Sequence, residues 1–169
     1  MTDEILKIKD MRKPEITERT KYSIVEPEFY DVKGCVFINN NGEKITEENV
    51  ERVQEYDEYQ TEYEHGRNEC RIIDYFGDIG YKQQLYLALE ILEIWSQKLH
   101  QQFLNEEFHI IISADVDEDV IIYFHKLHDG EDTWLDEDNL EMYKLNAILV
   151  NIVEADKDED DEIESEDED

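Results

Sequence analysis

Cationic side chains are scarce in this chain of 169 residues, which has 16 Lys and Arg against 47 Asp and Glu and a formal net charge of -31. A protein with this charge repels the phosphates of nucleic acids and of anionic membranes, so we expect it to bind neither directly. Hydrophobic residues nevertheless make up 40% of the chain and aromatic residues 11%, too many for a chain that is disordered throughout. We therefore expect a folded core and a basic partner.

Long apolar runs are also lacking. The N-terminal sequence MTDEILKIKDMRK has no apolar core of the kind found in secretory signals, and no apolar stretch is long enough to span a membrane. Only two cysteines occur, Cys35 and Cys70, and they form no C-x-x-C motif. We expect reduced thiols and a cytoplasmic protein, with a single structural disulfide as the alternative.

Motifs of catalysis and phosphate binding are missing as well: G-x-x-x-x-G-K-[ST], G-x-G-x-x-G, G-x-S-x-G and H-E-x-x-H do not occur. His125 and His128 suggest a metal site, but on one continuous strand they would point to opposite faces. The acids from Asp156 onward suggest an EF-hand calcium loop, but Asp161 stands at the position where this loop requires glycine. We expect no enzyme activity, no cofactor and no dedicated metal site.

The clearest periodic signal lies in residues 80–104. Apolar side chains recur there at steps of three and four, which keeps them on one face of a helix: Tyr81, Leu85, Ala88, Leu92, Trp95, Leu99 and Phe103. We interpret the stripe as core packing, in preference to a cofactor-binding row of aromatics. The pattern predicts one long, deeply packed helix.

Short runs rich in β-branched and aromatic residues follow this helix and predict strands. They cover Phe108–Ser113, Val120–Leu127 and Leu145–Val153, with weaker candidates at Tyr22–Val25 and Gly34–Asn39 and a turn at Asn39–Gly42. The link between the first two runs is short enough for a hairpin. The predicted fold class is α+β, with an antiparallel sheet of about three to five strands packed on the long helix.

A second, weakly amphipathic helix is predicted after Thr46, which can act as its N-cap. Its apolar residues drift around the helix because they recur mostly at steps of three: Val50, Val53, Tyr56, Tyr59 and Tyr63. At the other end of the chain, residues 154–169 carry twelve acids and one Lys. We expect a disordered tail there, and a single acidic domain over residues 1–153 with a net charge of about -20.

Acids and aromatics alternate at two places, around Tyr56 and Tyr59 and around Trp134. Either these aromatics complete the edge of the core, or they anchor a partner whose Lys and Arg meet the surrounding acids. The second interpretation assigns the predicted partner-binding residues: Tyr56, Tyr59, Asp115, Asp117, Glu118, Asp119, Glu131, Asp132, Trp134, Asp136 and Asp138.

The order of residues 80–153 resembles that of small acidic immunity proteins of bacterial polymorphic toxin systems. The resemblance rests on the helix GYKQQLYLALEILEIWSQKL, the acidic hairpin link ADVDED, the stretch FHKLHDGEDTWL and the closing EDNLEMYKLNAILV. It implies a stoichiometric inhibitor that binds a secreted toxin domain, often a nuclease, inside the producing cell or its kin. No catalytic residue, cofactor or oligomeric state is implied.

A different class of inhibitor remains open, a phage-encoded DNA mimic that blocks a host restriction or defence nuclease. Duplex DNA carries one charge per about 1.7 Å of its axis, so the net charge of about -20 on residues 1–153 would imitate roughly 34 Å of duplex. A mimic needs its acids spaced along an elongated surface, whereas an immunity protein needs a local patch with aromatic anchors. The interleaved aromatics favour the patch.

Overall fold

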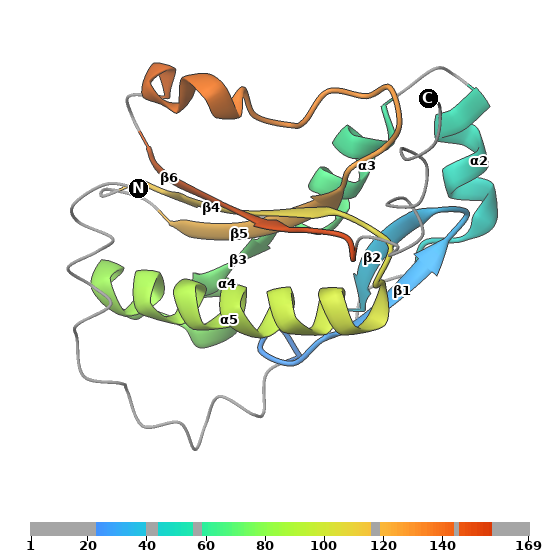
Figure 1. Cartoon of the computed structure of the whole chain (residues 1–169). Coiled ribbons are helices and arrows are strands. Elements are labelled where there is room, and N and C mark those ends of the chain that lie inside the picture. Colours follow the sequence, from blue (N-terminus) through green and yellow to red (C-terminus); the bar gives the residue numbers. More distant parts are fainter. Residues whose placement is uncertain (1–22, 40–43, 56–58, 116–118, 144–145, 157–169) are drawn as a thin grey trace, which may run out of the picture.

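The computed structural model describes residues 23–39, 44–55, 59–115, 119–143 and 146–156. Within them the predicted α+β class is confirmed, with two antiparallel sheets and four α-helices (Figure 1). In chain order the elements are β1 (Glu28–Val32), β2 (Cys35–Asn39), α2 (Glu47–Glu55), α3 (Gln60–Arg67), β3 (Cys70–Arg71), α4 (Ile72–Phe76), α5 (Tyr81–Gln102), β4 (Phe108–Ala114), β5 (Val120–Lys126), the 3-10 helix η2 (Glu137–Met142) and β6 (Ala147–Val153).

The larger sheet has the strand order β3-β5-β4-β6. Its strand β4 pairs with both β5 and β6, so that Ile111 lies opposite Tyr123 on one side and Val150 on the other. The apolar runs at Phe108–Ser113, Val120–Leu127 and Leu145–Val153 supply these three strands. The fourth, β3, has only two residues, too few to show any alternation in the sequence.

Both faces of this sheet are covered. Helix α5 lies along one face, and the segment containing η2 crosses the other (Figure 1). Ile110 and Phe124 pack in one core cluster with residues of α5, whereas Ile111 and Tyr123 pack with Leu135. Because alternate residues of a strand point to opposite faces, this double coverage explains why β4 and β5 are apolar at nearly every position.

Strands β1 and β2 form a separate hairpin. Its turn residues Lys33 and Gly34 both have positive φ, 56° and 86°, as the tight turns that match strand twist require. The sequence places a strand at Tyr22–Val25 instead, and this prediction is wrong for the described part, because Ser23–Val25 form a turn. Two acids in EFYDV obscure the alternation of apolar and polar residues, so the sequence does not predict β1.

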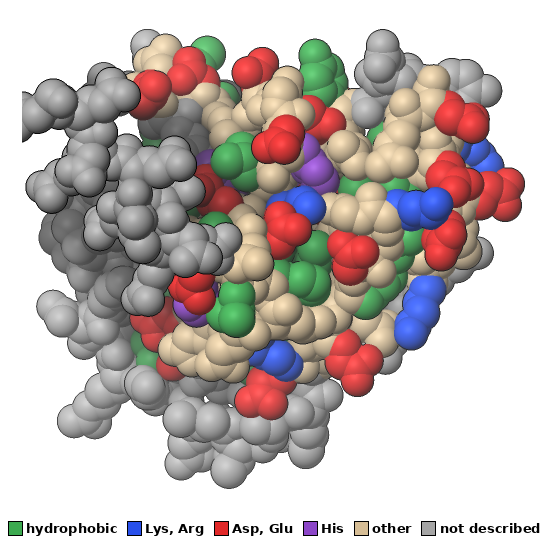
Figure 2. All heavy atoms as spheres, turned by 45° about the vertical axis from the view of Figure 1, so that its right-hand side comes forward, with side chains coloured by type: hydrophobic (Ala, Val, Ile, Leu, Met, Phe, Trp, Pro, Cys, Tyr) green, Lys and Arg blue, Asp and Glu red, His purple; other side chains and the backbone are tan. Residues whose placement is uncertain are grey.

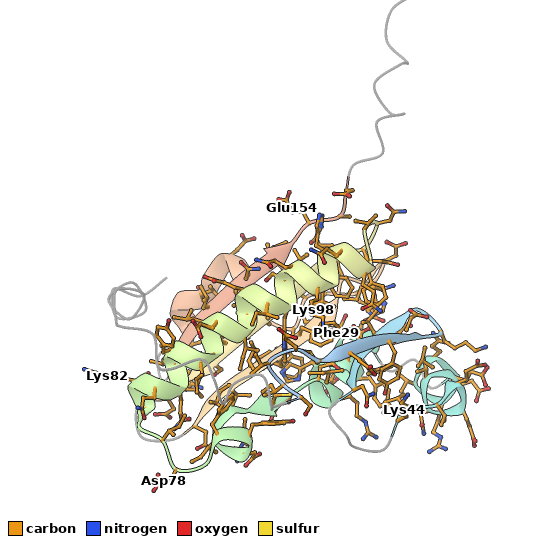
Figure 3. The ribbon with its side chains drawn as sticks, turned by 90° about the horizontal axis from the view of Figure 1, so that it is seen from below. Phe29, Lys44, Asp78, Lys82, Lys98 and Glu154 are labelled. Carbon is orange, nitrogen blue, oxygen red and sulfur yellow. The ribbon has the colours of Figure 1, made fainter. Side chains whose placement is uncertain are left out.

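The chain before β1 is fixed to helix α5. The indole Nε1 of Trp95 donates to the Ile24 carbonyl at 2.8 Å, and Lys98 Nζ donates to the Pro27 carbonyl at 2.7 Å. Phe29 packs edge-on against Trp95, with ring centroids 6.0 Å apart. These contacts hold the hairpin beside the C-terminal half of α5 (Figure 3).

The single helix predicted after Thr46 is replaced by two, α2 and α3. The buried residues of α2 are Val50 and Val53, whereas those of α3 are Thr61 and Glu64. An apolar stripe that advances by steps of three rotates around the helix axis, so one straight helix could not keep it against one surface. Splitting the segment lets each half bury its own face.

Cys35 and Cys70 are both buried and free, so the alternative of a disulfide is wrong. No helix in the described part of the chain combines the length and apolar content needed to cross a membrane. Residues 157–169, most of the predicted acidic tail, lie outside the described residues, as do residues 40–42 of the predicted turn.

Candidate functional site

Helix α3 joins the two sheets through side chains. The carboxylate of Glu64 accepts the backbone N–H groups of Val36 in β2 at 2.5 Å and Lys126 in β5 at 2.6 Å. One turn later, Asn68 accepts from the Ile38 N–H at 3.0 Å and donates to the carbonyls of Val36 and Phe124. Both side chains are fully buried. They satisfy backbone groups of two strands that belong to different sheets.

Three chemically different side chains meet beside this junction. Cys35 of β2, Glu64 of α3 and His128 after β5 bring their Sγ, carboxylate oxygen and ring nitrogen atoms within 4.8 Å of one another. The distance from His128 Nε2 to Glu64 Oε2 is 3.2 Å. The Gln60 amide oxygen accepts the Cys35 thiol at 3.5 Å. The cluster has the donor set of a metal site, or of a structural ion pair with a neighbouring thiol.

Burial governs the charge states of this cluster. It raises the pKa of Glu64, against the opposing effect of His128 and the backbone N–H groups of Lys126 and Val36. Burial and the nearby Glu64 carboxylate raise the pKa of the Cys35 thiol to about 12. A thiol that stays protonated is a poor nucleophile, and Cys35 is inaccessible to a substrate. The arrangement therefore does not support thiol catalysis.

The segment that follows β5 is fastened to the start of α3. Tyr59, the N-cap residue, makes no capping bond with its own side chain. Instead the carboxylate of Glu131 accepts the backbone N–H of Gln60 at 3.0 Å and that of Thr61 at 2.8 Å. Burial alone would raise the pKa of Glu131, but the hydrogen bonds from Thr61 and Gln60 lower it below its usual value. A predicted partner-binding acid thus caps a helix.

Trp134 lies against the last turn of the same helix. Its ring stacks on His65 with centroids 3.9 Å apart and an angle of 18° between the planes, and the His65 ring meets Tyr123 edge-on at 4.2 Å. Burial lowers the pKa of His65 to about 4, so the imidazole is neutral at pH 7. Trp134 remains 40% exposed and Tyr59 58% exposed. Each of these aromatics therefore offers apolar surface to a partner.

The chain next to Trp134 forms an acidic hollow. The cavity has a volume of about 540 Å³ and is lined by Asp132, Thr133, Leu135, Asp136 and Asp138. The three aspartates are exposed, and none forms an ion pair with a cation among the residues that the structure describes. We call Trp134 and this hollow the Trp134 patch. Its shape and charge suit a protruding Lys or Arg side chain.

The other predicted partner-binding acids lie elsewhere. Asp115 and Asp119 flank the β4–β5 link, at the Val120 end of β5, and Asp119 pairs with Arg71 at 3.4 Å. The segment leading to Trp134 leaves the opposite end of β5, roughly 20 Å away along a seven-residue strand. Tyr56, Asp117 and Glu118 lie outside the described residues. The structure therefore brings together Tyr59, Glu131, Asp132, Trp134, Asp136 and Asp138, and separates them from the hairpin acids.

Sequence reasoning missed Glu64, His65 and the role of His128. The sequence predicts opposite faces for His125 and His128 on one continuous strand, but β5 ends at Lys126 and His128 lies in the loop that follows. Locally, Glu64 is marked only by its place in a helix with few apolar residues. An acid in such a helix is expected to face water, so its burial is not predicted. Nothing local connects it to Cys35, 29 positions earlier.

A family model matches residues 2–163, which is nearly the whole chain. The chain belongs to the uncharacterized protein PM0498 family. No curated protein and no solved structure matches it significantly. The matched region includes both sheets, α3 and the Trp134 patch.

Proposed function

We propose that this member of the PM0498 family is a non-enzymatic acidic inhibitor, which binds and neutralises a basic protein through the Trp134 patch. The proposed partner is a nuclease toxin domain, as for immunity proteins, and the proposed place of action is the cytoplasm of the producing cell. The observation that carries this proposal is a half-exposed tryptophan, fixed by stacking on His65, whose neighbours in the sequence on both sides line an acidic hollow.

A fixed aromatic ring is well suited to anchor a protein interface. Stacking on His65 restricts the Trp134 side chain before binding, so less rotamer entropy is lost when a partner covers it. Tryptophan is among the residues that contribute most to interfaces when it is surrounded by groups that exclude water. Since Glu131 binds the α3 N-terminus, Tyr59 lies on the same rigid unit.

The acidic charge around Trp134 increases the rate and the selectivity of association with a basic partner. A nuclease carries a basic groove for its substrate, and acids that face such a groove raise the association rate by about 10 to 10³-fold. Asp132, Asp136 and Asp138 are available for this purpose because their carboxylates are exposed. An inhibitor of a toxic enzyme benefits from fast association.

The DNA-mimic alternative is less well supported by the surface. Figure 2 shows acidic and basic side chains interspersed on the face that carries α2. Lys33 pairs there with Glu51 at 2.8 Å, and Arg52 lies 3.8 Å from Glu48. A mimic of the DNA backbone would need an unbroken row of negative charge. The mixed charges on this face favour a local binding patch.

The proposal is tested by capture and inhibition. The full chain is immobilised, exposed to native host lysate at low salt, and the captured protein is identified and assayed for nuclease activity with and without added chain. We expect a basic nuclease that is inhibited at a one-to-one ratio. A captured restriction or defence nuclease encoded by the host would instead support the mimic, and no basic protein at all would contradict both.

Two variants locate the binding surface. Trp134→Ala combined with Asp136→Lys should weaken binding at least tenfold, because it removes the anchor and reverses one charge of the hollow. Asp78→Lys changes charge by the same amount at an exposed position before α5 (Figure 3) and should bind like the wild type apart from a small effect of net charge. Equal binding by both variants would remove the Trp134 patch from the interface.

A further inference from the structure

Cys35, Glu64 and His128 come from three separate segments, strand β2, helix α3 and the loop after β5. Their relative exposures are 0%, 0% and 7%, so all three are withdrawn from solvent. One donor atom from each lies within 4.8 Å of the other two. A buried thiol, carboxylate and imidazole that converge on one point are uncommon, because each carries a cost of burial unless it is partnered.

We propose that Cys35, Glu64 and His128 bind a transition-metal ion of the Zn²⁺ type. Zn²⁺ accepts this mixture of sulfur, nitrogen and oxygen donors, whereas Ca²⁺ and Mg²⁺ require sites built from oxygen. Donors around a tetrahedral Zn²⁺ stand roughly 3.5 Å apart, as its bond lengths of about 2.0 to 2.3 Å dictate. The three donors need to close by only about an ångström, which side-chain rotation provides.

The His128 ring supplies a second, independent indication. Its Nε2 atom is buried and faces Glu64 Oε2 at 3.2 Å, but the two atoms are not aligned as in a regular hydrogen bond, so this contact leaves the ring nitrogen poorly satisfied. Buried polar atoms of this kind call for an explanation. A metal ion in front of the Nε2 lone pair satisfies the ring without requiring it to be protonated.

Charge balance agrees with a divalent ion. When it binds, the Cys35 S–H bond breaks, the proton passes to solvent, and the sulfur forms a bond with the metal. The two positive charges then meet one thiolate and one carboxylate, with His128 neutral, so the occupied site has no net charge. Backbone N–H groups of Val36 and Lys126 hold the Glu64 carboxylate in place, as outer-shell groups do in metal proteins.

A fourth donor is also at hand. The Gln60 amide oxygen is 3.5 Å from the Cys35 sulfur and receives a hydrogen bond from Gln54 Nε2 at 2.8 Å. This oxygen or a water molecule completes the tetrahedron. The site would clamp the β1–β2 hairpin, α3 and the loop that leads to Trp134, and it does not depend on any partner protein.

Cobalt provides the decisive test, because a cysteine thiolate bound to Co²⁺ gives an ultraviolet charge-transfer band and tetrahedral Co²⁺ absorbs strongly in the visible. The full chain is stripped with a chelator and titrated with Co²⁺ and then with Zn²⁺. We expect both signals to saturate at one ion per chain and to disappear as Zn²⁺ displaces Co²⁺. Exposed carboxylates bind Co²⁺ without a thiolate band, so folded wild-type protein that lacks this band overturns the proposal.

Matched variants identify the ligands. Cys35→Ser should abolish the charge-transfer band, whereas Cys70→Ser, at the other buried cysteine, should retain it. His128→Gln should weaken Co²⁺ binding at least tenfold, and His100→Gln on the exposed side of α5 should not. Persistence of the band in Cys35→Ser, or full affinity in His128→Gln, contradicts the assignment.

Thermal unfolding gives a readout that does not need a coloured ion. Zn²⁺ at a hundredfold excess over its dissociation constant should stabilise the wild type by about 2.7 kcal/mol. The same excess should leave Cys35→Ser unchanged. If Cys35→Ser fails to fold, the wild-type titration and His128→Gln still decide the question. An equal midpoint with and without Zn²⁺ in the wild type supports a structural Glu64–His128 ion pair instead.

Discussion

At the residue scale, the side chains of Glu64 and Asn68 form hydrogen bonds to backbone groups that neighbouring strands satisfy elsewhere in the fold. Strands β2 and β5 belong to different sheets, yet each presents backbone groups to the interior. Glu64 in α3 and Asn68, the C-cap residue of this helix, supply the missing donors and acceptors. Neither residue stands out in the sequence, because a Glu and an Asn in a polar helix normally face water.

Replacing Asn68 by Ala should destabilise the protein by about 2 to 4 kcal/mol, because the Ile38 N–H and the Val36 and Phe124 carbonyls lose their partner in the interior. Urea unfolding followed by circular dichroism measures the change. Asn146→Ala, at an exposed residue with one side-chain bond to Ser113, should cost less than about 0.5 kcal/mol. Similar losses for the two variants would refute the bridging role.

Two histidines, the buried His125 and the partly buried His65, should make the fold sensitive to acid. Burial lowers the pKa of both His65 and His125 to about 4, below the usual value of 6.5. Between these values the unfolded chain binds the proton and the folded chain does not, so stability is present above pH 6.5 and falls as the pH drops towards 4. Each histidine contributes a slope of up to about 1.4 kcal/mol per pH unit.

The experiment compares slopes rather than absolute stabilities, since many carboxylates titrate nearby. His125→Phe should show a flatter decline of the urea midpoint between pH 6.5 and 5 than the wild type. His100→Phe, where the side chain is partly exposed on α5, should keep the wild-type slope. A wild-type slope in His125→Phe would show that this ring binds its proton equally in the folded and unfolded states, and would contradict the lowered pKa.

At the scale of elements, α3 lacks a cap of its own and receives one from a segment about 70 positions later. The sequence predicts one helix from Thr46 onward because local periodicity cannot show where a distant carboxylate will bind. The strands β4, β5 and β6 were predictable for the opposite reason. They are apolar over most of their length and adjoin clear turn or link sequences.

Glu131→Ala should therefore destabilise the fold by about 1 to 2 kcal/mol, as the loss of an N-cap does. Asp129→Ala, two positions away and exposed, should have almost no effect. Chemical unfolding measures both. Because hydrogen bonding lowers the pKa of Glu131, its contribution is present above pH 4.5 and should fade as the pH drops below that value. Equal stability of the two variants would exclude the cap.

At the scale of the whole molecule, the net charge of -31 sets the response to salt. Self-repulsion in a compact chain is relieved by screening, and the Debye length shrinks from about 30 Å at 0.01 M to about 3 Å at 1 M salt. We expect the thermal midpoint to rise by several degrees over this range. A chain ending at Asp156 loses ten acids and one Lys, which changes the net charge from -31 to -22.

This shortened chain should respond less to NaCl than the full chain when both are followed by thermal denaturation. Sucrose, which is uncharged, should raise the two midpoints by similar amounts and so serves as the control. A fall in the midpoint of the full chain with salt would mean that attractive ion pairs, such as that between Lys33 and Glu51, outweigh the repulsion.

The acidic character, the α+β class and the positions of β4, β5, β6 and α5 could be predicted from the order of residues alone. These features follow from composition, from short apolar runs rich in β-branched residues and from an apolar period of 3.6 residues, which are all local properties. The convergence of Cys35, Glu64 and His128 and the support of Trp134 by His65 become visible only in the folded chain. These contacts join segments that are far apart in the sequence. They depend on how the segments pack, and the local pattern of apolar residues contains no information about that packing.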